Sequence, residues 1–170
     1  ADLISKIQSK EFAIVSEHLV SGSEITYSGS LLEDLETIGF NKKSWSWPVH
    51  EVLYKKFEEL SLPIFGGNLS QEDINNIYEG KKFSQSDTLT TIVKRSTLDD
   101  QSKDKLINDL VVGHCGVVEE DLLSFMFKVQ RLRDASLAYI ASKNAPAIVI
   151  AGNGHVRRDY GVPQILKKMN

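Results

Sequence analysis

Three short apolar runs, separated by segments with helical periodicity, constrain the fold of this chain more than any other feature. The runs cover residues 12–15, 62–65 and 147–151. Each is too short for a helix, and each contains the β-branched or aromatic residues that are typical of a buried strand. The run 147–151 has no polar residue, which is the mark of a central parallel strand covered by helices. We therefore predict a layered α/β fold with a mostly parallel sheet flanked by helices.

Apolar residues at helical spacing predict the helices around these strands. The expected helices cover 2–10, 31–38, 48–60, 70–79, 99–111 and 119–143, and a last one opens at 161–163. The helix over 48–60 is expected to bury Val49, Leu53, Phe57 and Leu60. The longest, 119–143, is expected to bury Leu122, Met126, Val129, Leu132 and Leu137. The segment 81–98 is polar and weakly patterned, and could be lid-like.

The length of the chain suits one compact domain. A chain of 170 residues can bury a sizeable core, but two domains would be cramped. We therefore predict a single α/β domain over residues 1–170. Within it, the extra helical segments of residues 81–118 form an insertion or a lid.

The composition excludes several classes of protein. The formal net charge is −3, with both signs interspersed. A nucleic-acid-binding protein usually has a strong basic bias, so we expect no nucleic-acid partner. No apolar run approaches the roughly 18 residues that span a bilayer. Cys115 is the only cysteine, which excludes an internal disulfide and a cysteine-based metal cluster. We expect Cys115 to be a small residue of the core.

Polar side chains follow each of the three predicted strands. Glu17-His18 follows the first strand, Gly66-Gly67-Asn68 the second, and Gly152-Asn153-Gly154-His155 the third. Ligands of open α/β sheets bind beyond the carboxyl ends of the strands, and parallel strands end at the same edge. A carboxylate, an amide and an imidazole are therefore expected to converge on one crevice.

The loop after the third strand carries the densest set of candidate ligand groups. The two glycines around Asn153 allow a positive φ and a close approach of a ligand to the backbone. His155, Arg157, Arg158 and Tyr160 follow within a few residues, and these side chains ligate or pair with anions. The alternative interpretation is a polar turn with a surface histidine.

Two other histidines and one helix face are weaker candidates. For His114, which lies between two glycines, a structural and a functional role both stay open. For His50, beside two tryptophans, we expect a role in capping or packing the start of its helix. On the long helix, Gln130, Arg133 and Asp134 share one face. They form either a solvated cluster, or a set in which Arg133 or Arg131 orients Asp134 toward the crevice.

Several of these segments together resemble a known family. Residues 130–138, 147–155 and 159–163 look like the C-terminal signature of ChaN-like haem-binding proteins. Trp45-Ser46-Trp47-Pro48 and residues 62–68 also fit that pattern. The resemblance covers most of the chain and is strongest over its C-terminal part. The family belongs to a wider superfamily that includes Tiki-type and erythromycin-esterase-like proteins.

The superfamily resemblance implies two Gly-x-x-His motifs and acidic residues around one cleft. Here 152–155 matches the second motif, and Glu17 matches the acid at a strand end. The first motif is absent, so we expect at least one N-terminal strand to be missing from this chain. A metal-dependent hydrolase that uses Glu17 and His155 is the alternative function. Because the first motif is absent, we prefer the interpretation that the cleft holds a cofactor over the interpretation that it catalyses a reaction.

The family resemblance implies haem binding for iron acquisition. It implies a lipoprotein of the cell envelope, whose contact with the membrane is a lipid anchor outside this chain. It also implies a homodimer that binds haem between two protomers. Members are similar in using a tyrosine to ligate the haem iron, and phenolate is a hard anion that suits ferric iron.

The resemblance does not identify the tyrosine, so position in the sequence decides. Tyr160 is the first choice because it lies nearest to His155, and Tyr27, in a loop rich in serine and glycine, is the second. The expected partners of the haem propionates are His155, Arg157 and Arg158. The remaining tyrosines lie on predicted helices and are expected to pack: Tyr54, Tyr78 and Tyr139.

Overall fold

The computed structural model describes residues 12–116 and 118–169, and the predicted helix over 2–10 lies outside them. The chain divides into two compact units. The first runs to Asn68 and includes Ile140–Ile150, and the second comprises Leu69–Tyr139 and the residues from Ala151 onwards. The single domain over residues 1–170 stays a prediction.

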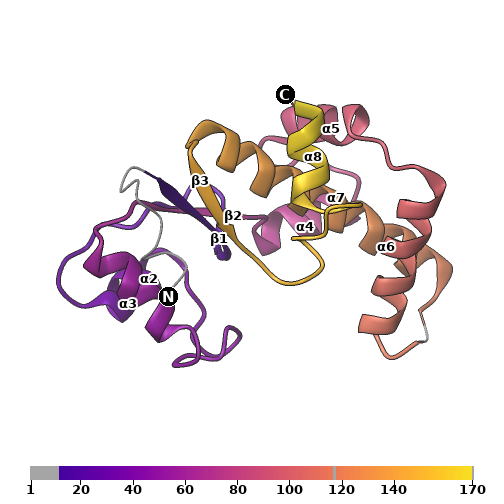
Figure 1. Cartoon of the computed structure of the whole chain (residues 1–170). Helices are drawn as coiled ribbons and strands as arrows, with labels where there is room; N and C mark the ends of the chain where they lie inside the picture. Colours follow the sequence, from indigo (N-terminus) through magenta and orange to yellow (C-terminus); the bar gives the residue numbers. More distant parts are fainter. Residues whose placement is uncertain (1–11, 117, 170) are drawn as a thin grey trace. The chain divides into compact units, whose positions relative to one another are not determined.

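The first unit contains a parallel sheet of three strands. The strands are β1 (Ala13–Val20), β2 (Ile64–Asn68) and β3 (Ala147–Ile150), in the order β2-β1-β3 (Figure 1). Ile14 of β1 is in register with Ile64 on one side and Ile148 on the other. The predicted α/β class with a parallel sheet is confirmed. The predicted central position of the third strand is wrong, because β3 forms an edge of this sheet and is only half-buried.

The central strand is β1, and it is longer than the sequence suggests. We predicted that it ends where polar side chains begin, but it continues through Ser16, Glu17 and His18 to Val20. These polar residues are buried. The Oγ atom of Ser16 lies 2.8 Å from the Tyr54 hydroxyl, and Nδ1 of His18 lies 3.0 Å from it. A buried strand accepts polar side chains when they have such hydrogen-bond partners.

A glycine within β2 allows the two strands to approach closely. We expected the glycines after Phe65 to end the strand, whereas Gly66 lies inside it. A Cβ atom at this position would lie 1.9 Å from the carbonyl oxygen of Val20, far inside van der Waals contact. Position 66 therefore requires glycine, for the close backbone approach rather than for a turn.

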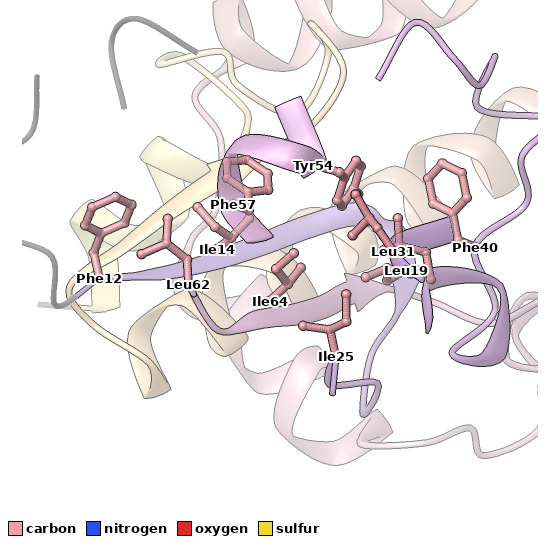
Figure 2. Close-up of a cluster of buried hydrophobic side chains, with 11 residues drawn as sticks. Phe12, Ile14, Leu19, Ile25, Leu31, Phe40, Tyr54, Phe57, Leu62 and Ile64 are labelled. Atoms are coloured by element: carbon pink, nitrogen blue, oxygen red, sulfur yellow. The ribbon is translucent and has the colours of Figure 1, made fainter. Parts of the chain in front are cut away.

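Two helices and a loop complete the first unit. The helices are α2 (Leu31–Thr37) and α3 (Glu51–Glu59), and Gly39, at φ 92°, follows α2 as predicted. Tyr54 and Phe57 of α3 point into the buried cluster that Figure 2 shows. Val49, predicted to be buried, is 75% exposed because it lies before the first turn of α3. The cluster comprises Phe12, Ile14, Leu19, Ile25, Leu31, Leu35, Phe40, Tyr54, Phe57, Leu62 and Ile64.

The second unit is helical. Its helices are α4 (Gln71–Tyr78), α5 (Ser86–Arg95), α6 (Asp100–Gly113), α7 (Glu120–Lys143, whose last four residues belong to the first unit) and α8 (Val162–Met169). Helix α4 begins with the predicted capping box, in which Ser70 and Asp73 satisfy each other's backbone N–H groups. Helix α5 lies within the segment 81–98, for which we predicted no helix because its apolar pattern is weak. Helices α5 and α8 lie side by side (Figure 1).

Some predicted core positions of the second unit are exposed. Val129, Leu132 and Leu137 of α7 are buried as expected, but Leu122 is half-exposed because the first turn of α7 is solvated. Cys115 is exposed rather than part of the core, in the turn after α6. None of the helices in the described residues is long and apolar enough to cross a membrane.

Candidate functional site

The strand-end residues of the first unit form a buried polar and aromatic cluster. The His18 ring lies 4.4 Å from the rings of both Trp45 and His50. Burial, together with the nearby His50, lowers the pKa of His18 to about 4. Nδ1 of His50 donates to the Trp45 carbonyl oxygen at 2.6 Å, so its predicted packing role is confirmed. The Asn68 amide donates to the backbone oxygen of Glu17 at 3.0 Å, which joins two of the predicted strand ends.

The loop 152–155 follows β3 as predicted, but its histidine faces the interior of the second unit. His155 is 5% exposed. Its Nδ1 atom lies 2.6 Å from Oδ1 of Asp134 and 3.1 Å from Nε2 of Gln130. The interpretation as a surface histidine is therefore wrong. The shared helix face of Gln130 and Asp134 meets this ring and is not a solvated cluster, because Asp134 is fully buried.

Arg131 fixes the segment that follows the loop. Its buried guanidinium donates to the carbonyl oxygen of Tyr160, and to that of Ser96 at 2.7 Å. It also donates to the side-chain oxygen of Gln164 at 3.2 Å. Burial lowers the pKa of Arg131. These bonds connect α7 to the end of α5 and to the start of α8, so Arg131 has a structural role.

Tyr160, the predicted iron ligand, is buried in the second unit. Its hydroxyl donates to the carboxylate of Asp109, and the Arg157 guanidinium lies 5.1 Å from the centre of its ring. Burial, followed by the hydrogen bond to Asp109, raises the pKa of Tyr160. An iron-bound phenolate at this position would require the ring to become accessible and the hydroxyl to leave Asp109.

The predicted propionate partners are divided between exposed and buried positions. Arg157 is exposed and pairs with Asp159 at 2.9 Å and with Asp109 at 3.6 Å. Arg158 is exposed and lines a cavity of about 490 Å³, together with Lys167 and Lys168. Arg158 therefore lies on the wall of a surface cavity, where an anion can reach it.

Tyr27, the second predicted ligand, lies in the first unit and is half-buried. Its hydroxyl donates to the carbonyl oxygen of Leu62 at 3.0 Å. Burial, with the nearby Glu58 and Asp34 carboxylates, raises the pKa of Tyr27 to about 12. Its phenolate is therefore disfavoured at neutral pH.

Tyr78, which the sequence places among packing residues, is the most exposed tyrosine. It is 74% exposed at the end of α4. Its ring meets the Phe125 ring edge to face, with centroids 5.3 Å apart. Its hydroxyl makes no hydrogen bond to any part of the chain that the structure describes. The sequence signal was an aromatic residue in the last turn of a helix, two residues before Gly80.

A groove lies beside the end of α4. It has a volume of about 480 Å³, and α5 and α7 also contribute to its walls. Its apolar lining includes Ile77, Phe83, Val93 and Leu132, and four lysines surround it: Lys81, Lys82, Lys94 and Lys128. The second unit therefore combines an apolar groove, several cations and an exposed phenol.

The part of the chain that the structure describes offers no ligand cluster for a catalytic metal. Within residues 12–116 and 118–169, no group of three or more His, Cys, Asp or Glu side chains could hold a metal ion. Glu17 lies in the first unit and His155 in the second. The hydrolase alternative stays a prediction that no observation here favours.

Comparison with known proteins identifies the family. No curated protein matches the sequence. A solved structure described as cofacial haem binding to ChaN of Campylobacter jejuni matches with a TM-score of 0.71 and 20% identity, over 94% of this chain and 63% of that chain. At this identity the match shows the fold, and this chain spans less than two thirds of that ChaN. The family described as haem-binding uptake, Tiki superfamily, ChaN matches residues 2–166. The chain is therefore a member of the ChaN family.

Proposed function

We propose that this protein binds haem for iron acquisition, with a tyrosine phenolate as the iron ligand. The observation that carries the proposal is membership of a haem-binding uptake family over nearly the whole chain. Haem needs an apolar surface for its macrocycle, cations for its propionates and a ligand for its iron. The second unit provides apolar residues and lysines around one groove, and an exposed tyrosine, Tyr78, at the end of α4.

The choice of tyrosine follows from accessibility. Tyr160 and Tyr27, the two predicted ligands, each use the hydroxyl group in an internal hydrogen bond. Either would have to give up that bond and expose its ring before it could reach the iron. A tyrosine that is already exposed needs neither change.

We further propose that two copies of the chain share the haem. The solved ChaN of Campylobacter jejuni is described as binding haem cofacially, and haem groups held face to face can lie between two copies of a chain. Sedimentation velocity with and without hemin tests it: we expect the mass to double when hemin is present. A mass that stays monomeric at saturating hemin would refute it.

The proposed location is the cell envelope, at a membrane surface, through a lipid anchor outside residues 1–170. The role in haem uptake that describes the family supports this place. Fractionation of cells that express the natural gene product tests it, and we expect the protein in the membrane fraction, from which detergent releases it.

Hemin titration tests the proposed function itself. Hemin bound to a phenolate in a protein has a Soret band that differs from that of free hemin, so we expect saturable growth of a new band. Buffer and an unrelated protein of similar charge serve as controls. If the spectrum remains that of free hemin at every protein concentration, the proposal is refuted.

A further inference from the structure

We infer that the cavity beside α8 binds the phosphate group of a small polar ligand, through Arg158, Lys167 and Lys168. This inference goes beyond the proposed function, because haem has no part in it. It also differs from the sequence-based expectation that Arg158 pairs with a haem propionate. The cavity lies within the second unit. Its described lining comprises Thr97, Leu98, Asp99, Ser102, Arg158, Asp159, Gln164, Lys167 and Lys168.

The first step of the argument is the charge of the three basic side chains. Arg158, Lys167 and Lys168 are exposed, and none of them forms a salt bridge with residues 12–116 or 118–169. All three line one cavity of a chain whose formal net charge is −3. The positive charge is therefore local and opposite in sign to that of the chain as a whole. Such a local excess of cations attracts an anion to this cavity.

The second step is the state of the two acidic residues in the lining. Asp159 accepts a hydrogen bond from Arg157 at 2.9 Å and from Lys105 at 3.4 Å. The bond from Arg157 lowers the pKa of Asp159 to about 2. Asp99 caps α6, where its carboxylate accepts the backbone N–H of Ser102 at 2.8 Å. Other groups therefore engage both carboxylates, and the three basic side chains leave an excess of positive charge. A phosphate monoester, with a charge of about −1.5 to −2 at pH 7, complements that excess.

The third step is the way in which the walls of the cavity are held. The buried guanidinium of Arg131 donates to the carbonyl oxygens of Ser96 and Tyr160. It also donates to the side-chain oxygen of Gln164, whose amide donates in turn to the Ser96 carbonyl oxygen at 3.3 Å. These acceptors belong to the segments that form the walls, which are the end of α5, the loop before α8, and α8 itself. Because one buried side chain connects all three, a ligand has little of the chain to order when it binds.

The fourth step is the size and the chemistry of the cavity. Its volume of about 490 Å³ lies within the range of about 300–1,000 Å³ that is usual for small-molecule sites, so it has room for more than a phosphate ion. Leu98 is the one apolar residue among the described residues of the lining. A ligand body with hydroxyl groups fits such walls better than a fatty chain or an aromatic ring does. Glycerol phosphate has this chemistry, both as a free ester and as the headgroup of phosphatidylglycerol.

Calorimetric titration with glycerol 3-phosphate tests the site. We expect saturable binding that weakens as NaCl is added, because salt screens exposed ion pairs. Arg158→Gln, Lys167→Gln and Lys168→Gln should each weaken binding by about 1.5- to 5-fold. The triple variant should weaken it by about 3- to 100-fold, which is the product of the single effects. Lys128→Gln is the matched control, since it removes an equal charge from an exposed position of α7 outside this lining, and it should bind like the wild type. Circular dichroism checks that every variant is folded.

Vesicle sedimentation distinguishes a lipid headgroup from a free phosphate ester. The vesicles consist of phosphatidylcholine alone or of phosphatidylcholine with phosphatidylglycerol. If the headgroup is the ligand, only the vesicles with phosphatidylglycerol should sediment the wild-type protein, and the triple variant should stay in solution. If glycerol 3-phosphate binds and neither kind of vesicle does, the ligand is a free ester. Either result supports the phosphate site and identifies its source.

Three results would overturn the inference. The first is a wild-type protein that binds neither glycerol 3-phosphate nor vesicles with phosphatidylglycerol. The second is a triple variant that keeps the wild-type affinity for glycerol 3-phosphate. The third is an equal loss of affinity in Lys128→Gln, which would indicate a response to the net charge of the protein rather than to this cavity.

Hemin titration of the same variants keeps this inference apart from the proposed function. We expect the triple variant to bind hemin like the wild type. A triple variant that loses affinity for hemin and keeps its affinity for glycerol 3-phosphate would overturn the phosphate site and return Arg158 to the haem. A wild-type protein that binds glycerol 3-phosphate but not hemin would refute the proposed function and leave this inference intact.

Discussion

Tyr54→Phe removes one hydroxyl that two polar groups of the central strand share. That hydroxyl lies 2.8 Å from Oγ of Ser16 and 3.0 Å from Nδ1 of His18, and the tyrosine is fully buried. Ser16 Oγ still accepts the backbone N–H of His18 at 3.1 Å, so it keeps one partner in the variant. The imidazole nitrogen loses the bond. Unfolding free energy should therefore fall by about 2–3 kcal/mol, from one unsatisfied buried group and one partly satisfied group.

Chemical and thermal unfolding measure this loss. For a chain of this length, 1 kcal/mol corresponds to about 2–4 °C in Tm, so we expect a decrease of about 4–12 °C. Tyr78→Phe makes the same chemical change at an exposed hydroxyl that has no hydrogen-bond partner among the described residues, and should leave Tm unchanged. A Tyr54→Phe variant with the wild-type Tm would refute the reasoning that these hydrogen bonds hold polar residues inside β1.

Three further predictions concern other parts of the structure. Gly66→Ala should lower the free energy of unfolding by more than the about 1–3 kcal/mol that is typical of overpacking, because its Cβ atom would meet backbone atoms. Gly113→Ala, whose Cβ atom would lie in open space, should be neutral or slightly stabilising in the same urea titration. The pKa of His18 is lowered to about 4 in the folded state from 6.5, so the unfolded chain binds more protons between these values. The contribution of neutral His18 to the free energy of unfolding should therefore be complete above pH 6.5 and fall as the pH decreases toward 4. A urea midpoint that rises as the pH decreases from 6.5 to 4 would contradict this sign. Cys115 is exposed and should react with a thiol reagent in the native protein, whereas slow reaction that needs denaturant would indicate a buried thiol.

Local sequence patterns predicted most of the helices because their signals act within one or two turns. The capping box of Ser70 and Asp73 marks the start of α4, and the apolar spacing over 119–143 marks α7 almost to the residue. Helix α5 was missed, although Leu89, Ile92 and Val93 lie at i, i+3 and i+4 and form a short apolar stripe on it.

The strands show where local patterns fail. Apolar runs located the three strands, and from them the sequence predicted a mostly parallel sheet. The sequence did not predict the order of the strands. The most apolar run, 147–151, lies at an edge, and the run that is followed by Ser16-Glu17-His18 lies at the centre. A polar residue reads as a strand end in sequence, whereas its hydrogen bonds to Tyr54, 38 and 36 residues away, are decided only in the folded chain.

For the candidate site, the sequence by itself determined the family and the chemistry to look for. The segments 130–138, 147–155 and 159–163 were enough to indicate haem and a tyrosine ligand. Only the tertiary structure decided which side chains are accessible. It turned His155 inward to Asp134 and Tyr160 to Asp109, and left Tyr78 exposed at the end of α4. Accessibility depends on which neighbours cover a side chain, and those neighbours come from distant parts of the sequence.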